Sequence, residues 1–299
     1  MSFSFINPEE FGELFLSESF EKIYRCMSAD FQQSLPLDQF ITIASSFNEG
    51  VQYYQVEIKT TLQNLDCYIW LDDQKEQGIA VSFDQSNQIQ SLLIKPHITY
   101  PETDNRLTQN AYSMPISGEW IVFWGGTNEF INYHYAYEHM RYAYDLVKVQ
   151  EGVSFHNTPK QNENFYAFNE EIVAPADGKV VKRIDGLADC IPGETDEENA
   201  AGNYVVIEHA HNEYSLLAHL KKDSIQVEIG DLVKEGQFIG KCGNSGNTSE
   251  PHLHFQVMDS PDLHNAKSLR IQFKDGIDPI QGDTISNALQ QKESFEEQI

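Results

Sequence analysis

The chain has 299 residues, and its 46 acidic and 20 basic side chains give a formal net charge of -26 at pH 7. This excess of acid argues against nucleic acid or an anionic membrane as a partner, because both require a basic surface. Hydrophobic residues make up 40% of the chain, enough to form the cores of two domains of ordinary size, and we expect two.

The four cysteines are far apart and form no CxxC pair, which disfavours a cysteine zinc site and a disulfide framework. The first residues lack the basic and apolar regions of a secretory signal, and no apolar run is long enough to span a bilayer. We therefore expect no membrane span. The sequence as written predicts a cytoplasmic location. A cell-wall or extracellular location would require another export route.

The first part of the chain predicts helices followed by strands. Asn7-Pro8-Glu9-Glu10 is typical of a helix start, with an Asn cap and Pro at the first helical position. A second helical pattern covers residues 37–47. Strand patterns follow at residues 51–65, 67–71, 79–83 and 89–94. This order predicts a small α+β domain over residues 1–96, and it resembles the cone-shaped nuclear-transport-factor-2-like domains found ahead of some secreted hydrolases.

Residues 97–115 follow Pro96 and contain Pro101 and Pro115 among polar residues, which predicts a linker. Residues 116–282 contain short strand patterns separated by glycine-rich turns, which predict a mainly antiparallel β domain. The expected strands cover residues 120–124, 143–149, 172–183, 204–209, 214–220 and 238–242. Residues 283–299 are expected to form an acidic C-terminal tail.

Two histidines alternate with apolar residues near the end of the predicted β domain. In a strand over residues 251–257, His252 and His254 face one side, while Leu253, Phe255 and Val257 face the other. Such a strand can bury its apolar side and present a metal ligand beside a catalytic base on its polar side. An isolated His-x-His pair is a weak signal, so the surrounding motifs decide its interpretation.

Three motifs lie on or just before this strand. They are Ile229-Gly-Asp-Leu-Val-Lys-Glu-Gly-Gln-Phe-Ile-Gly240, Gly243-Asn-Ser-Gly246 and Pro251-His-Leu-His-Phe255. Together with residues 173–180 and 214–220, they make most of residues 116–280 resemble the lysostaphin-type, or LytM-like, zinc metallopeptidases. The resemblance implies a lysostaphin-like sheet of the duplicated-hybrid-motif type, zinc as cofactor, and hydrolysis of peptide bonds in peptidoglycan cross-links or related peptides.

The resemblance also implies roles for individual residues. His254 and Asp145 match zinc ligands of the family, and His219 and His252 match its two catalytic histidines. Two histidines and one aspartate suit a catalytic zinc, which takes three protein ligands and keeps one position for water. A neutral histidine can then take the proton of that water and later support the oxyanion or protonate the leaving amine.

The third ligand is not given directly by the family motif. Most members place a histidine four residues before the aspartate, and Arg141 occupies that position here. We favour His134 as the ligand, because Asn132-Tyr133-His134 followed by an insert resembles a longer-spaced branch of the family. His139 is the second candidate.

Two alternatives to an active peptidase remain. A catalytically degenerate member would keep the fold as a binding or regulatory module, and the altered ligand spacing and missing export signal both favour that possibility. A carrier domain is the other, because Gly-Asp-x-Val-x-x-Gly-Gln hairpins also occur in biotinyl and lipoyl domains. No lysine lies at a hairpin tip in a suitable context for that role, and the histidines would have no function.

Overall fold

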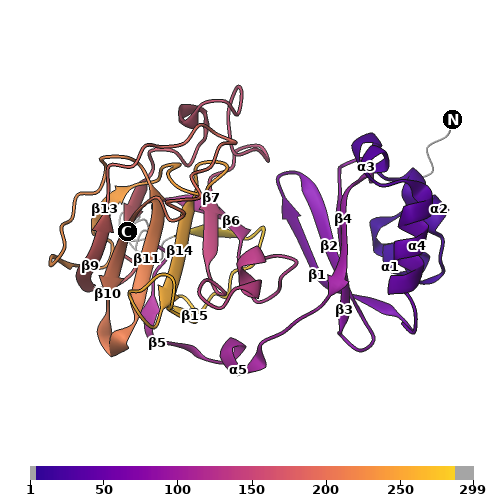
Figure 1. The fold of residues 1–299 in the computed structure, drawn as a ribbon, viewed down its shortest axis with the longest axis horizontal. Coiled ribbons are helices and arrows are strands. Elements are labelled where there is room, and N and C mark those ends of the chain that lie inside the picture. Colours follow the sequence, from indigo (N-terminus) through magenta and orange to yellow (C-terminus); the bar gives the residue numbers. More distant parts are fainter. Residues whose placement is uncertain (1–4, 287–299) are drawn as a thin grey trace, which may run out of the picture. The chain divides into compact units, whose positions relative to one another are not determined.

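The computed structural model describes residues 5–286, and the chain divides into two compact units at residues 99 and 100 (Figure 1). In the first unit, helices lie against one face of an antiparallel sheet with the strand order β1-β2-β3-β4. Its elements are η1 (Pro8–Glu10), α1 (Phe11–Leu16), α2 (Phe20–Arg25), α3 (Ala29–Ser34), α4 (Leu37–Phe47), β1 (Tyr54–Leu62), β2 (Leu65–Asp72), β3 (Gln77–Phe83) and β4 (Ile89–Pro96). The predicted α+β architecture is confirmed.

Aromatic packing joins the helices of the first unit to its sheet. The ring centroid of Phe11 on α1 lies 5.2 Å from that of Trp70 on β2 and 6.2 Å from that of Phe83 on β3. All three side chains are almost fully buried. The chain enters this core through the predicted cap, where Asn7 Oδ1 accepts a hydrogen bond from the Glu9 backbone N–H at 3.3 Å. The chain first makes the 3₁₀ turn η1, with Pro8 at its first position, and then continues into α1.

The second unit is built on a ten-stranded, mainly antiparallel sheet, as predicted. Its main path has the order β12-β9-β10-β11-β14-β7-β6-β16, and β15 pairs with both β14 and β5. A separate pair is formed by β8 and β13. The strands are β5 (Leu107–Tyr112), β6 (Glu119–Trp124), β7 (Tyr144–Val147), β8 (Glu171–Val173), β9 (Gly178–Ile184), β10 (Asn203–Glu208), β11 (Tyr214–Leu220), β12 (Leu232–Val233), β13 (Phe238–Lys241), β14 (Leu253–Met258), β15 (Ser268–Phe273) and β16 (Thr284–Ser286).

Two segments expected to be irregular contain regular structure. Residues 97–115, the predicted linker, include helix α5 (Pro101–Asp104) and strand β5, which pairs in parallel with β15. The buried carboxylate of Glu213 accepts hydrogen bonds from the backbone N–H groups of Gln109 and Asn110, so long-range contacts order this polar strand. At the other end, β16 pairs with β6. The rest of the predicted tail, residues 287–299, lies outside the described residues.

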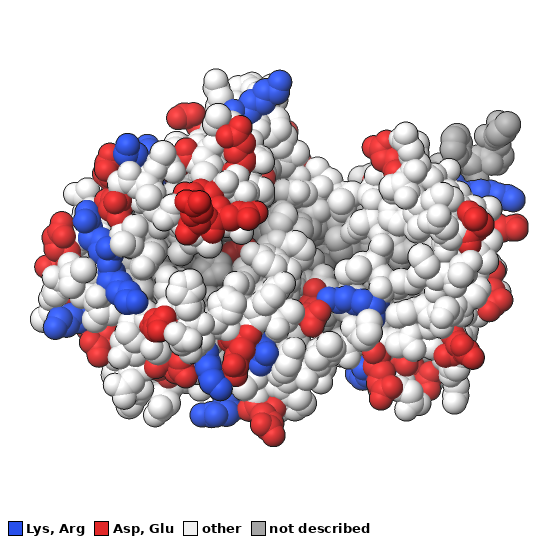
Figure 2. All heavy atoms as spheres, viewed as in Figure 1, with Lys and Arg blue, Asp and Glu red and all other residues white. Residues whose placement is uncertain are grey.

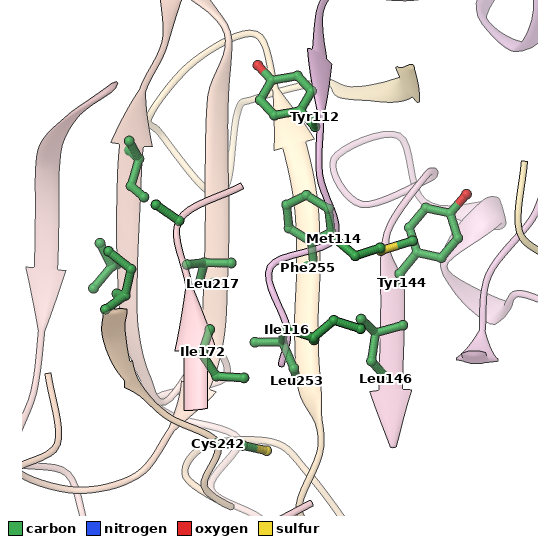
Figure 3. Packing of buried hydrophobic residues seen from close by; sticks show 14 of the residues in the cluster. Tyr112, Met114, Ile116, Tyr144, Leu146, Ile172, Leu217, Cys242, Leu253 and Phe255 are labelled. Atoms are coloured by element: carbon green, nitrogen blue, oxygen red, sulfur yellow. The ribbon is translucent and has the colours of Figure 1, made fainter. Parts of the chain in front are cut away.

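The core of the second unit lies under the apolar side of β14 and its neighbours. Leu253, Phe255 and Val257 are fully buried, as the alternation in the sequence predicts. Figure 3 shows Leu253 and Phe255 on β14 close to Tyr144 and Leu146 on β7. Burying one such side chain contributes roughly 1.5–3 kcal/mol, so this face anchors β14 firmly. The opposite side of the strand is then free to carry polar groups.

The surface of the protein reflects its composition. On the face drawn in Figure 2, lysine and arginine side chains are scattered among acidic ones and form no continuous basic patch. Within residues 5–286, none of the helices combines the length and the apolar character that crossing a membrane requires.

Candidate metal centre and adjacent histidines

The pairing of β14 with β7 brings two of the predicted ligands together. In this antiparallel register His254 is directly opposite Asp145, while the neighbouring pairs are apolar. Directly opposed residues on one face have Cβ atoms about 4.5–5.5 Å apart, so their side chains can meet. His254 Nδ1 lies 2.9 Å from Asp145 Oδ1. Two segments that are more than 100 residues apart in the sequence therefore form one side of the site.

His134 completes a group of three potential ligands. It lies on the 3₁₀ turn η2 (Tyr133–Ala136), between β6 and β7, and is fully buried. His134 Nε2 is 3.4 Å from Asp145 Oδ2. One potential ligand atom from each of His134, Asp145 and His254 lies within 4.8 Å of the other two, an arrangement that a single metal ion can bridge.

A buried asparagine holds the loop that carries His134. The Asn132 side-chain Nδ2 donates to the backbone carbonyls of Gly126, Arg141 and Ala143 at 3.0, 3.3 and 3.2 Å. Its Oδ1 accepts from His134 Nδ1 at 2.8 Å and from the His134 backbone N–H at 3.2 Å. This network closes the longer insert between His134 and Asp145, and so compensates for the spacing that differs from the short family motif.

Arg141, which stands where the short motif would have a histidine, has a structural role. It is buried, its guanidinium lies 3.4 Å from the centre of the Tyr100 ring, and its Nε donates to the Tyr135 backbone carbonyl at 3.1 Å. A guanidinium over an aromatic face is a favourable cation–π arrangement. Arg141 therefore packs the insert instead of facing the ligand group.

Burial and neighbouring charges set the protonation of the group. Burial would raise the pKa of Asp145, but the nearby His134 and His252, together with hydrogen bonds from His252 and His254, hold it well below its usual range. Burial lowers the pKa of His134 to about 4, despite the attraction of Asp145. At neutral pH, the group therefore contains an ionised carboxylate beside a neutral imidazole, the forms in which both residues bind metals.

The two remaining histidines of the prediction lie beside this group. His219 on β11 and His252, just before β14, have ring centroids 4.7 Å apart. His219 Nδ1 lies 2.8 Å from the Ser245 backbone oxygen, and His252 Nδ1 lies 2.9 Å from the Glu250 backbone oxygen. Because a carbonyl oxygen only accepts, both Nδ1 atoms carry a proton, and Nε2 is the ring nitrogen that each histidine leaves for chemistry beside the ligand group. His252 Nε2 is 3.6 Å from Asp145 Oδ1.

The environments of these two histidines differ. Burial lowers the pKa of His219 to about 3. Burial would also lower the pKa of His252, but the charge of Asp145 raises it above its ordinary value. His219 also has a left-handed backbone with φ of 60°, which costs roughly 1–2 kcal/mol for a residue other than glycine. Its backbone N–H donates to Ala201 and its carbonyl accepts from Gly243, so the surrounding loops hold this strained conformation.

One atom indicates that the group is suited to a cation. His134 Nε2 is buried and has no hydrogen-bond partner, although it lies close to the carboxylate of Asp145. Its other ring nitrogen already bonds to Asn132 Oδ1, so Nε2 presents a lone pair to the carboxylate. Leaving such a buried acceptor unpaired costs about 1–3 kcal/mol, which a bound cation would relieve. The donor set of two imidazoles and one carboxylate fits zinc. Zinc usually has four ligands, and histidine nitrogens and carboxylate oxygens are common among them.

His139, the second candidate for the third ligand, is not one of the three residues in the ligand group. It takes part through its backbone instead, because its carbonyl accepts from Gln256 Nε2 at 3.1 Å. Gln256 Oε1 in turn lies 3.0 Å from His254 Nε2. The sequence motifs assign no role to Asn132, Ser245 or Gln256. A signal existed for Gln256, because it continues the polar face of His252 and His254, whereas the carbonyl of Ser245 carries no signal in its residue type.

Residues 163–266 match the family model described as Peptidase family M23. The matched segment contains His219, His252 and His254, and it begins after both His134 and Asp145. The family comparison therefore covers only part of the group that the fold brings together.

The chain is also similar to individual proteins. It is 43% identical over 70 residues to an uncharacterized metalloprotease of Buchnera aphidicola subsp. Baizongia pistaciae, and the matched segment makes up 23% of this chain and 18% of that protein. It is 48% identical over 58 residues to the peptidoglycan DD-endopeptidase ShyB of Vibrio cholerae, 19% of this chain and 13% of that protein. Among solved structures, the antimicrobial peptidase lysostaphin from Staphylococcus simulans aligns with 21% identity and a TM-score of 0.30, covering 52% of this chain and 50% of lysostaphin. The chain thus spans less than a fifth of either sequence relative.

Proposed function

We propose that this chain, which contains a peptidase family M23 domain, is a zinc-dependent endopeptidase that hydrolyses peptide bonds in peptidoglycan cross-links or related peptides. The observation that carries the proposal is the convergence of His134, Asp145 and His254 within 4.8 Å, beside two further histidines. Three ligands and an open fourth position are typical of catalytic zinc, whereas structural zinc sites have four protein ligands.

In this proposal, His134 Nε2, His254 Nδ1 and the Asp145 carboxylate would hold zinc. Bound zinc would supply the Lewis acidity that polarises the scissile carbonyl and activates water. The ligand residues are held on β7, β14 and a loop closed by buried hydrogen bonds, so they need little rearrangement to bind the ion. A site prepared in this way loses little conformational entropy on metal binding.

His219 and His252 are assigned the proton transfers. Each is anchored through Nδ1 to a backbone carbonyl, which fixes the ring and leaves Nε2 beside the ligand group. Such a nitrogen can accept the proton of the attacking water, or carry a proton that stabilises negative charge on the substrate carbonyl oxygen and is then given to the leaving amine. The reaction is amide hydrolysis by water, without a covalent intermediate on the protein.

The substrate class in the proposal comes from the sequence relatives. ShyB is a peptidoglycan DD-endopeptidase, and its similarity to this chain reaches 48% identity over the matched segment. A peptide cross-link is also the kind of bond that zinc and a pair of histidines can hydrolyse.

The first experiment is to measure metal content by mass spectrometry after dialysis against a mild chelator, and then to incubate the protein with purified peptidoglycan. We expect about one zinc per chain, and chromatography of the digest should show new peptide ends. His254→Ala should abolish both results, whereas the exposed His264→Ala, outside the ligand group, should change neither. A protein that binds no zinc, even after zinc is added back, would refute the proposal and favour a degenerate binding module.

A further inference from the structure

We propose that two neutral side-chain amides, those of Asn132 and Gln256, are positioning residues that determine which nitrogen of each histidine ligand faces the metal. This inference rests on the proposed zinc site and concerns the residues behind it. Both amides are buried and belong to different segments, one to the loop before β7 and the other to β14. Each is hydrogen-bonded to one ligand histidine.

The orientation of the Asn132 amide is determined by its surroundings. Its nitrogen faces three backbone carbonyl oxygens, which can only accept hydrogen bonds. Its oxygen must therefore face His134 Nδ1, at 2.8 Å, and that nitrogen must carry the proton. The lone pair of His134 is then on Nε2, the buried atom that lacks a hydrogen-bond partner and faces Asp145.

The Gln256 amide acts in the same way on the other histidine. Its nitrogen donates to the carbonyl of His139, so its oxygen faces His254 Nε2 at 3.0 Å. His254 Nε2 therefore donates to Gln256, and Nδ1, 2.9 Å from Asp145 Oδ1, is the nitrogen left for the metal, which would replace its hydrogen bond to the carboxylate. The two amides thus engage opposite ring nitrogens, which leaves Nε2 of His134 and Nδ1 of His254 facing the same carboxylate.

The hydrogen bond from Gln256 to His139 also connects the two halves of the site. It joins β14, which carries His254, to the insert that follows His134. Because the amides are neutral, they orient the histidines without adding negative charge to a group that already contains Asp145.

The test compares zinc affinities, measured for the full chain by competition with a chromophoric chelator. Gln256→Met keeps the size of the side chain but loses both hydrogen bonds, and we expect its zinc affinity to fall about 10–100-fold. Gln256→Glu keeps an acceptor for His254 Nε2 and should retain most of the affinity. Gln281→Met is the matched control, because Gln281 is similarly buried and donates to the Phe123 carbonyl. Its zinc affinity should equal that of the wild type.

A second measurement does not depend on the folding of any variant. Long-range proton–nitrogen NMR spectra of the wild-type protein with ¹⁵N-labelled histidine report which ring nitrogen carries the proton. In the zinc-bound protein, we expect Nδ1 to be protonated in His134 and Nε2 in His254. The reverse tautomers, or wild-type zinc affinity in Gln256→Met, would overturn the inference while leaving the proposed function intact. A wild-type protein that binds no zinc would instead refute the proposed function.

Discussion

A single methyl group added at Gly202 should displace His219 without altering any histidine. A Cβ atom at this glycine would lie 2.1 Å from the backbone oxygen of Ser245. That oxygen accepts the hydrogen bond from His219 Nδ1 at 2.8 Å. Contacts of a Cβ atom shorter than 3.0 Å are essentially never seen, so in Gly202→Ala the carbonyl must move by about 0.9 Å, the difference between 3.0 and 2.1 Å.

Such a displacement is large for an active site. Misplacing a reacting group by about 1 Å can reduce turnover about 100-fold, and we expect kcat/KM for peptidoglycan cleavage to fall by that order in Gly202→Ala. Overpacking should also lower the free energy of unfolding by roughly 1–3 kcal/mol. Zinc content should not change, because the hydrogen bonds of Ser245 join it to Asn203, His219 and Leu220 and not to the three proposed ligands. The assays are chromatography of digests, metal analysis and urea unfolding.

Gly193→Ala provides the control for backbone strain. Like Gly202, Gly193 has a positive φ, but a Cβ atom there would have no neighbour within 4 Å. It should therefore lose only about 1 kcal/mol of stability and keep its activity. If the two alanine variants had equal kcat/KM, or if Gly202→Ala lost its zinc, the proposed link from the Ser245 carbonyl to His219 would be refuted.

Three further predictions concern individual histidines. His254→Ala should remove zinc and activity together, whereas His219→Ala should keep zinc and lower turnover by about 100- to 10,000-fold, measured by metal analysis and initial rates; equal zinc loss in both would contradict their assigned roles. His134→Ala should release zinc and His139→Ala should not, and the opposite result would exchange their roles. Burial lowers the pKa of His209, so below its ordinary pKa the unfolded chain takes up a proton that the folded chain does not. Stability should therefore fall as pH decreases from 7 to 5, and the decrease should be smaller in His209→Gln by urea unfolding; an equal decrease would exclude this contribution.

Local patterns were sufficient for the elements that bury one side. Alternation over residues 251–257 predicted a strand with its apolar residues in the core, and β14 has this arrangement. Strand β5 was not recognised, because its polar residues show no clear alternation. It is ordered by the carboxylate of Glu213, about 100 residues further along the chain. A strand stabilised by a distant polar group leaves little trace in its own sequence.

The proposed ligand group shows the same contrast. The choice between His134 and His139 rested on spacing and resemblance, and it remains a proposal that metal binding will test. What the sequence did not contain was the path of the insert, which depends on the hydrogen bonds of Asn132 and on the stacking of Arg141 over Tyr100. These contacts form only when the loop closes on itself and on a preceding segment.

The sequence by itself determined which residue types were available and which face of β14 they would occupy, because the period of a strand is a local property. Tertiary structure alone decided which atoms converge. The register between β7 and β14 places Asp145 opposite His254, and the amides of Asn132 and Gln256 orient the rings. Register and hydrogen-bond partners depend on the packing of distant segments, so their geometry appears only in the folded chain.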